Sequence, residues 1–248
     1  MGARLVLILG GTAEAAALAE ALVAGSAWHP LTSLAGRTTA RRGLPGEVRV
    51  GGFGGIDGLV AWLEHHRPAA VIDATHPFAR QMPHHAAAAC KRLDLSRLRL
   101  ARPMWPRQPE DRWLEVEDAA QAVRVLPGFG KTAFLSTGSQ ELERFLTLAD
   151  RMRLVLRTIE KPADLPPGIV ALEARPPFGL DDELKLLRRY GVDVLVTKAS
   201  GGSATEAKIE AARQLGLPVV MLRRPPSPDG LLVHDVQGAL DWLAEFRA

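Results

Sequence analysis

Two glycines and a threonine stand where an apolar run turns into a helical pattern, in the segment LILGGTAEA. Glycine lets the backbone approach a ligand closely, and the first turn of a helix offers free N–H groups to an anion. The segment departs from the G-x-G-x-x-G pattern, because Ala15 stands at the third glycine position. It predicts a cradle for a pyrophosphate. The alternative is a plain strand-to-helix turn in which Thr12 caps the helix.

The segment SLAGRT follows the next apolar run. A dinucleotide-binding unit that prefers NAD carries an acid at this point, whereas an arginine accommodates the 2′-phosphate of NADP. No acid is present, and Arg37 stands among small residues, with the hydroxyls of Ser33 and Thr38 nearby and with Gly36 to permit close approach. The alternative is a solvated loop arginine. The position after the glycine turn favours the phosphate.

Two more segments of the first half follow strand-like runs. VGGFGGIDGL places four glycines around Phe53, which indicates either a backbone packed against adenine or the cofactor, or a glycine turn with Phe53 in the core. In IDATHPFA, Asp73 ends a buried run and a loop with His76 follows. Ligands of open α/β sheets lie beyond the carboxyl ends of strands, and histidine can transfer a proton near neutral pH. A lone histidine is more often structural than catalytic, so contact with a cofactor is the better-supported role.

The second half repeats the pattern in STGSQELERF and VTKASGGSATEAKIEAA. Both place glycine and hydroxyl residues between a strand and a helix, which is an anion-binding arrangement. Lys198 adds a mobile cation. The other expected strand ends that carry a cation are Arg157, Arg175 and Arg223. This repetition indicates a polyanionic ligand, although ordinary surface cations could produce one or two such cases.

Composition disfavours several classes of function. The 248 residues carry a net charge of +3 with scattered basic residues and 5% aromatics, so nucleic-acid binding is disfavoured. No segment approaches the roughly 20 apolar residues of a membrane span, and the N-terminus is interpreted as a buried strand rather than a leader, so we expect a cytoplasmic protein. The single cysteine, Cys90, excludes an internal disulfide and a multi-cysteine metal site, and we expect a buried thiol. The chain has two pairs of adjacent histidines in helical patterns. Adjacent residues of a helix point to different faces and are poorly placed to bind one metal ion, so no metal site is expected.

Apolar runs alternate with helical patterns from end to end, which predicts an α/β fold with mainly parallel sheets. The predicted strands are Arg4–Leu9, Pro30–Leu34, Val48–Val50, Ala70–Asp73, Leu98–Ala101, Thr132–Ser136, Arg153–Arg157, Val170–Ala174, Val192–Thr197 and Val219–Leu222. The predicted helices are Ala13–Ala24, Ile56–His65, Arg80–Leu93, Ala119–Leu126, Gln140–Leu148, Asp181–Tyr190, Thr205–Leu215 and Gly238–Phe246.

The segment RPMWPRQPEDR interrupts this alternation with three prolines, as a linker or hinge would. We expect a first domain over residues 1–125 and a second over 126–248. Strands that cross between the two halves remain an open alternative.

These motifs together resemble the precorrin-6A reductase family of cobalamin biosynthesis. The resemblance covers nearly the whole chain, and its most specific parts are IDATHPFA and VTKASGG. It departs from the family pattern at Ala199 and Pro176, neither of which removes a charged group. The resemblance implies two Rossmann-like domains with the active site in the cleft between them. It also implies an NADPH-dependent reduction of one C=C bond of precorrin-6A, which gives precorrin-6B.

The resemblance also implies roles for individual residues. The residues expected to bind the pyrophosphate are Gly10, Gly11, Thr12 and Ala13. Those expected at the 2′-phosphate are Ser33, Arg37 and Thr38, and Ala35 and Gly36 of the same segment are expected to contact the cofactor. Those expected to line the cofactor towards the nicotinamide are Gly52, Phe53, Thr75, His76 and Phe78. Those expected to bind the carboxylates of the tetrapyrrole are Arg157, Lys198, Ser200, Gly201, Gly202 and Arg223. The proton donor is expected to be His76, Lys198 or solvent.

Two rival functions stay open at this point. One is the same reduction of cobalt-precorrin-6A, which nothing in the sequence separates from the metal-free reaction. The other is a nucleotide-binding or tetrapyrrole-carrying protein without catalysis. The oligomeric state is not predicted.

Overall fold

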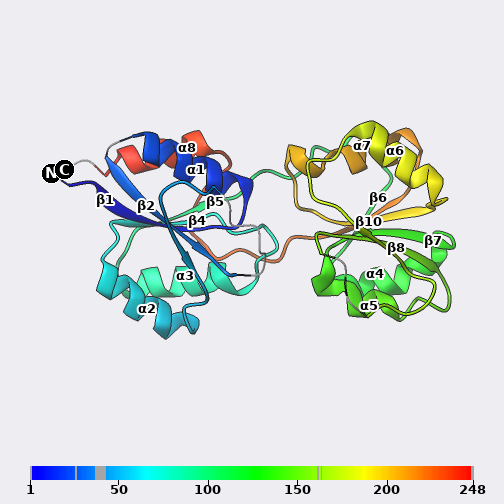
Figure 1. Ribbon diagram of the computed structural model, residues 1–248, viewed down its shortest axis with the longest axis horizontal. Coiled ribbons are helices and arrows are strands. Elements are labelled where there is room, and N and C mark those ends of the chain that lie inside the picture. The colour runs from blue at the N-terminus through cyan, green and yellow to red at the C-terminus, as the bar shows by residue number, and fades with distance from the viewer. Residues whose placement is uncertain (1, 26, 37–42, 161, 163, 247–248) are drawn as a thin grey trace. The chain divides into compact units, whose positions relative to one another are not determined.

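A computed structural model describes residues 2–25, 27–36, 43–160, 162 and 164–246 of the chain. The chain forms two compact units, of which the first combines Met1–Pro103 with Pro225–Ala248 and the second is Met104–Arg224. Each unit is a six-stranded parallel sheet with helices on both faces (Figure 1). This confirms the prediction of two Rossmann-like α/β domains.

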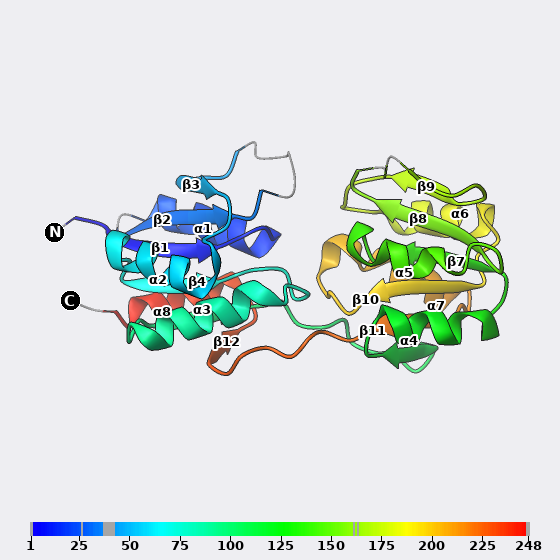
Figure 2. The same cartoon turned by 90° about the horizontal axis from the view of Figure 1, so that it is seen from below.

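The strands of the first unit have the order of a doubly wound dinucleotide-binding sheet. Across the sheet, the strands are β3 (Glu47–Val50), β2 (Trp28–Leu34), β1 (Arg4–Leu9), β4 (Ala70–Asp73), β5 (Arg97–Leu100) and β12 (Leu231–Val233). Figure 2 shows β3, β2, β1 and β4 in this succession. The central strands β1 and β4 are apolar and almost entirely buried, as expected for parallel strands covered on both sides.

Two apolar clusters fix the helices of this unit on the faces of the sheet. Helices α1 (Ala13–Ala24) and α8 (Val236–Ala244) cover one face, and α2 (Gly55–His66) and α3 (Gln81–Arg92) cover the other (Figure 1). Trp242 and Leu243 of α8 pack in the same cluster as Leu18 of α1. The predicted burial of the Cys90 thiol is confirmed, because Cys90 lies in α3 and is 2% exposed.

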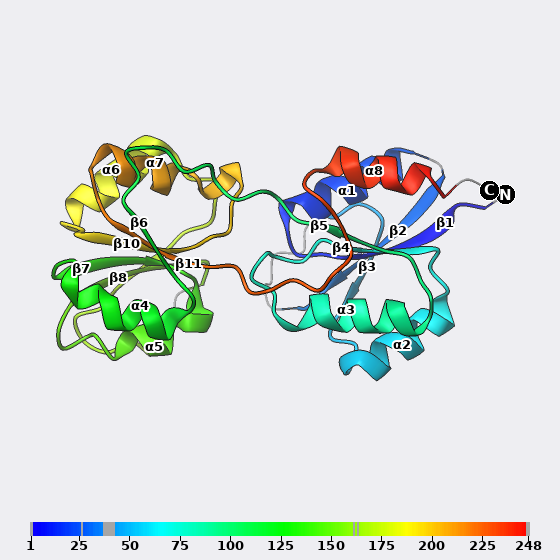
Figure 3. The same cartoon turned by 180° about the vertical axis from the view of Figure 1, so that it is seen from behind.

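The second unit repeats this strand order. Across the sheet, the strands are β9 (Val170–Glu173), β8 (Arg153–Thr158), β7 (Thr132–Ser136), β10 (Val194–Lys198), β11 (Val219–Leu222) and β6 (Trp113–Val116). The α-helices are α4 (Ala119–Val125), α5 (Leu142–Leu146), α6 (Leu180–Arg189) and α7 (Ala207–Gln214). Helices α6 and α7 lie on one face of the sheet, and α4 and α5 lie on the other (Figure 3). Single turns of 3-10 helix occur at Leu126–Gly128, Ser139–Glu141 and Ser203–Thr205.

The division of the chain differs from the expected boundary between residues 125 and 126. Strand β6 and helix α4 precede that boundary in sequence and belong to the second unit, because β6 pairs with β11. Strand β12 and helix α8 belong to the first unit, because β12 pairs with β5. Each sheet thus takes one edge strand from the other half of the chain. The sequence analysis left open that strands cross between the halves in this way.

Both exchanged strands were missed by the sequence prediction. They are short, and β12 exposes Leu231 and Leu232, which are 59% and 52% accessible. Among the described residues, no helix is long and apolar enough to cross a membrane. Within the same residues, no group of three or more His, Cys, Asp or Glu side chains is placed to hold a metal ion.

Candidate functional site

The carboxyl edge of the first sheet has a topological switch point between β1 and β4, which is where open α/β sheets bind ligands. The glycine turn follows β1, and the loop from Ala74 to Ala79 follows β4. Thr12 joins the two, because its Oγ1 donates to the Ala74 carbonyl at 2.8 Å and accepts from the Ala15 N–H at 3.2 Å. The helix cap predicted for Thr12 is therefore present, and the same hydroxyl also ties the two loops of the edge together.

Glycine is required at both positions of the turn for different reasons. A Cβ on Gly10 would lie 2.7 Å from Thr32 Cγ2, so the turn packs directly on β2. Gly11 has a φ of +109°, and a Cβ there would meet no atom within 4 Å. Open space in front of a left-handed glycine at the start of α1 fits the diphosphate of a dinucleotide.

Asp73 fixes the loop after β4. Its carboxylate is fully buried and accepts from the Arg99 guanidinium, which is 4% exposed. Its other oxygen accepts from the Thr75 N–H at 3.1 Å and from the Thr75 hydroxyl at 2.6 Å. The buried pair of charges thus holds the backbone that leads into His76. The sequence singled out Asp73 and Thr75 but gave no sign of Arg99 as the partner.

His76 is half-buried, and its ring has a defined hydrogen bond. The Phe78 N–H donates to His76 Nδ1 at 3.2 Å. In the neutral ring the proton is therefore carried by Nε2, which can act as a donor. The ring centroids of His76 and Phe78 lie 6.1 Å apart.

The edge at β2 and β3 contains a cation that the sequence analysis missed. Arg49 Nη1 donates to Ser33 Oγ at 2.9 Å, and its guanidinium carbon lies 3.9 Å from the centre of the Phe53 ring. Ala35 and Gly36 follow β2, and Gly36 has a φ of +78°. Arg37 and Thr38, the residues predicted to bind the 2′-phosphate, lie outside the described residues.

Phe53 packs into the core, which is one of the two roles that the sequence left open, and contact with a cofactor stays a prediction. It is half-buried, packs against the apolar cluster beneath α2, and contacts Trp62 edge to face at 5.6 Å. A Cβ on Gly58 would lie 1.7 Å from the Phe53 carbonyl oxygen, so the turn around it is tight. A Cβ on Gly52 would meet no atom within 4 Å, so the outer side of the turn is open.

Glu14 has a partner besides the helix dipole. Its carboxylate lies 3.0 Å from Arg102 Nη1, and both side chains are mostly buried. Arg102 follows β5, so the pair ties the start of α1 to a further loop of the same edge. The sequence explained Glu14 by the dipole alone.

The switch point of the second sheet lies between β7 and β10. Ser136 Oγ donates to the Val196 carbonyl at 3.1 Å and joins these two strands near their carboxyl ends. The predicted residue Lys198 ends β10, and Ser200, Gly201 and Gly202 lie in the loop that follows it. The structure therefore brings this group of predicted residues together.

Two residues that sequence reasoning missed hold this loop. Arg224 Nε donates to the Ala199 carbonyl at 2.7 Å, and its Nη2 donates to the Ser200 carbonyl at 3.1 Å. Trp105 Nε1 donates to the Gly202 carbonyl at 2.9 Å, and the ring is 5% exposed. The predicted residue Arg223 is exposed and pairs with Glu115 at 3.0 Å. Nothing in the sequence RRPP separates Arg224 from Arg223, because only the path of the chain after β11 decides which one faces the loop.

Arg157 is buried and already paired. Its Nη1 lies 2.5 Å from Glu183 Oε1, and the two residues are 8% and 1% exposed. Its guanidinium carbon lies 3.7 Å from the centre of the Phe178 ring, in the segment ARPPFG. The guanidinium therefore stabilises the loop between β9 and α6, and a substrate carboxylate would compete with Glu183 for it.

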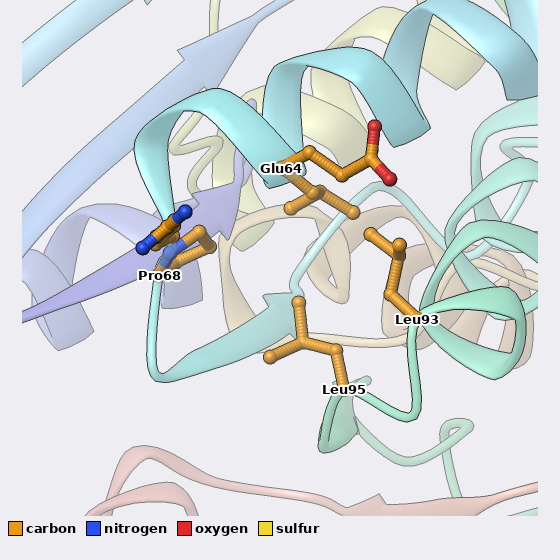
Figure 4. A pocket seen from close by; sticks show the side chains of 6 residues that line it. Glu64, Pro68, Leu93 and Leu95 are labelled. Atoms are coloured by element: carbon orange, nitrogen blue, oxygen red, sulfur yellow. The ribbon is translucent and has the colours of Figure 1, made fainter.

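A hollow of about 480 Å³ lies at the opposite edge of the first sheet (Figure 4). It is lined by Leu63, Glu64, Arg67, Pro68, Leu93 and Leu95. Pro68 and Leu95 precede β4 and β5, so the hollow lies at the amino ends of these strands. None of the predicted site residues lines it.

The chain is similar to known proteins along almost its whole length. The family described as Precorrin-6x reductase CbiJ/CobK matches residues 5–244. A precorrin-6A reductase of Rhodococcus erythropolis is 45% identical over 240 residues, which are 96% of both chains. A cobalt-precorrin-6A reductase of Salmonella typhimurium is 29% identical over 89% of this chain and 87% of its own. A solved structure of CobK precorrin-6A reductase superposes with a TM-score of 0.89 at 39% identity and covers 98% of this chain and 96% of its own.

Proposed function

Because the chain belongs to the precorrin-6x reductase family CbiJ/CobK, we propose that it reduces one C=C bond of precorrin-6A with NADPH and so forms precorrin-6B. The observation that carries this proposal is the identity of 45% over nearly the full length of a precorrin-6A reductase. The similarity to cobalt-precorrin-6A reductases is lower, at 29% for that of Salmonella typhimurium, which favours the metal-free macrocycle.

The chain is a reductase, and its first unit fits a nicotinamide dinucleotide. The open space at Gly11, the start of α1 and the cap at Thr12 suit the diphosphate. We assign the cofactor to this edge, with Gly10 to Ala13 at the diphosphate and with Ser33 to Thr38 at the ribose. When bound, NADPH supplies the hydride, and the protein supplies position and electrostatic field.

We assign the macrocycle to the second unit. Precorrin-6A carries acetate and propionate side chains, which suit the ammonium group of Lys198 and the hydroxyl of Ser200. Arg224 and Trp105 hold this loop through its carbonyl oxygens. Arg157 supports the neighbouring loop through its pair with Glu183.

Addition of a hydride to one carbon of the C=C bond requires a proton at the other. His76 fits this role, because its Nδ1 accepts from the Phe78 N–H and its Nε2 therefore carries the proton. Lys198 and solvent are the other sources. A His76→Gln variant would keep a polar group but could not donate a proton in the same way.

The test is a turnover assay in which the nicotinamide absorbance is followed with purified precorrin-6A. NADPH and NADH are compared, and cobalt-precorrin-6A is offered in parallel. Consumption of NADPH with formation of precorrin-6B is expected. Tight binding of both ligands without consumption would instead indicate a non-catalytic carrier, and faster turnover of the cobalt complex would assign the chain to the cobalt-containing route.

A further inference from the structure

Arg49 is a guanidinium held at the cofactor edge without an acidic partner. Its three hydrogen bonds to residues that the structure describes all go to neutral oxygens: Ser33 Oγ at 2.9 Å, the Gly51 carbonyl at 3.0 Å and the Gly52 carbonyl at 3.1 Å. Among the described residues, no carboxylate lies within ion-pair distance of it. The Nε–H and one Nη2–H have no acceptor in that same part of the chain, so two of the five donors of the fork are unused.

The other arginines of this edge differ from Arg49 in this respect. Arg99 is paired with Asp73, and Arg102 is paired with Glu14. Each of these charges is therefore neutralised within the unit. Burial lowers the pKa of Arg49 from its ordinary value, and the guanidinium stays protonated at neutral pH.

Aromatic rings fix the plane of the Arg49 guanidinium. Phe53 lies under it at 3.9 Å, and Trp62 of α2 supports Phe53 edge to face at 5.6 Å. Trp62 in turn stacks on His66 at 4.0 Å. A cation oriented by a stack of rings and two carbonyl oxygens loses little conformational entropy when it binds an anion.

The position of Arg49 in the sheet identifies the anion. Ser33 and Arg49 are register partners on β2 and β3, and the Ser33 carbonyl accepts from the Gly10 N–H at 2.9 Å. Gly10, Ser33 and Arg49 therefore lie side by side across three neighbouring strands. In a dinucleotide-binding unit the diphosphate lies at the first of these strand ends and the adenosine ribose at the second.

We propose that Arg49 is a specificity-determining residue that binds the 2′-phosphate of NADPH and distinguishes it from NADH. This inference rests on the proposed use of NADPH. Arg49 approaches the ribose position from β3, on the side away from the diphosphate, and Ser33 orients it. The sequence attributed this role to the SLAGRT segment alone, because Arg49 precedes a glycine turn in the next strand and has no motif of its own.

The alternative role for Arg49 is purely structural, as a support for the turn at Gly51 and Gly52. The two roles differ in what the loss of the guanidinium does to ligands with and without a 2′-phosphate. Isothermal titration calorimetry with 2′,5′-ADP and 5′-AMP measures this difference directly, because the two ligands differ only in that phosphate. The variants are Arg49→Met and Arg49→Lys.

The matched control is Arg4→Met. Arg4 also lies over an aromatic ring, at 5.4 Å from the centre of Trp28, but it stands at the amino end of β1. We expect R49M to bind 2′,5′-ADP about 10- to 100-fold more weakly, as for the loss of a hydrogen bond to a charged group, while 5′-AMP changes little. R4M is expected to match the wild type for both ligands.

The Lys variant covers the case in which R49M does not fold. Lysine keeps the charge but not the planar fork, so R49K is expected to show a reduced preference for 2′,5′-ADP. Equal weakening of both ligands in R49M, or an unchanged preference in both variants, would overturn the inference. If the wild type itself bound 2′,5′-ADP and 5′-AMP equally, the proposed use of NADPH would be wrong as well. This outcome differs from one in which only the variants contradict the role of Arg49, so the two proposals are tested separately.

Discussion

Arg157 and Glu183 form an ion pair at 2.5 Å, with both side chains more than nine-tenths buried. The guanidinium also lies 3.7 Å from the centre of the Phe178 ring and 5.1 Å from that of Phe134. Glu183 Oε2 has no hydrogen-bond partner among the described residues. The pair therefore stabilises the loop before α6 chiefly through one strong contact.

Glu183→Gln is expected to lower the free energy of unfolding by about 3–5 kcal/mol, because it leaves a buried guanidinium without its counter-charge. Urea denaturation measures the loss. Asp181→Asn is the matched control, since Asp181 is exposed in the first turn of the same helix and its loss costs about 0.3–1 kcal/mol. Equal costs for the two variants would show that the pair contributes no more than a surface charge.

Arg224→Met is expected to raise the KM for precorrin-6A about tenfold, equivalent to about 1.4 kcal/mol, and to leave the KM for NADPH unchanged. Arg224 donates to the carbonyls of Ala199 and Ser200 in the loop assigned to the macrocycle, whereas the residues assigned to the cofactor lie in the other unit. Steady-state kinetics with each substrate varied in turn gives both constants. Arg124→Met, at an exposed position of α4, should change neither, and an equal rise in both KM values for R224M would contradict the assignment.

Gly10→Ala is expected to destabilise the protein by about 1–3 kcal/mol and to weaken NADPH binding, because the new methyl group must displace Thr32 from 2.7 Å. Thermal unfolding and NADPH titration report the two effects. Gly128→Ala serves as the control, since a Cβ there meets nothing within 4 Å. A G10A protein that binds NADPH like the wild type would show that the turn does not hold the diphosphate.

Cys90 is expected to resist thiol reagents at pH 8 and to make the protein less stable as the solution becomes more alkaline. Burial raises the pKa of the thiol from its ordinary value of 9.0 to about 11. Between these values the unfolded chain releases the proton and the native protein retains it, so stability falls by up to about 1.4 kcal/mol per pH unit. Below pH 9 both states keep the proton and the thiol has no effect.

Unfolding in urea from pH 8 to pH 11, for the wild type and Cys90→Ala, tests this dependence. The difference between the two proteins should be constant below pH 9 and should change above it. Rapid labelling of the native thiol at pH 8 would show that it is accessible, and parallel pH curves would show that it does not titrate differently in the two states.

Local patterns predicted most of the fold. The five strands from β1 to β5 and the helix cap at Thr12 follow from continuous apolar runs and from a short polar residue before a helix. Strands β6 and β12 were missed because they are edge strands whose pairing partners are distant in sequence. When a strand is stabilised by pairing with a strand that is distant in sequence, its own residues do not reveal that pairing.

The candidate sites show the same division. Sequence patterns predicted the glycine turn, His76 and the loop after β10, because each of them lies in the segment between a strand and the helix that comes next. The residues that hold these segments were not predicted: Arg49, Arg99, Arg102, Trp105 and Arg224. Their partners are fixed by the packing of the chain rather than by spacing, and four of the five are arginines in a chain that contains many.

Because the two units exchange their sixth strands, the order of synthesis decides which unit can complete its sheet first. The second unit has its full sheet once residue 224 has been made, whereas the first still lacks β12 and α8. Until residues 225–246 leave the ribosome, β5 has an unpaired edge and the apolar face of α1 lacks the cover of Trp242 and Leu243. The nascent first unit therefore exposes a strand edge and an apolar helix face while the second unit can already fold.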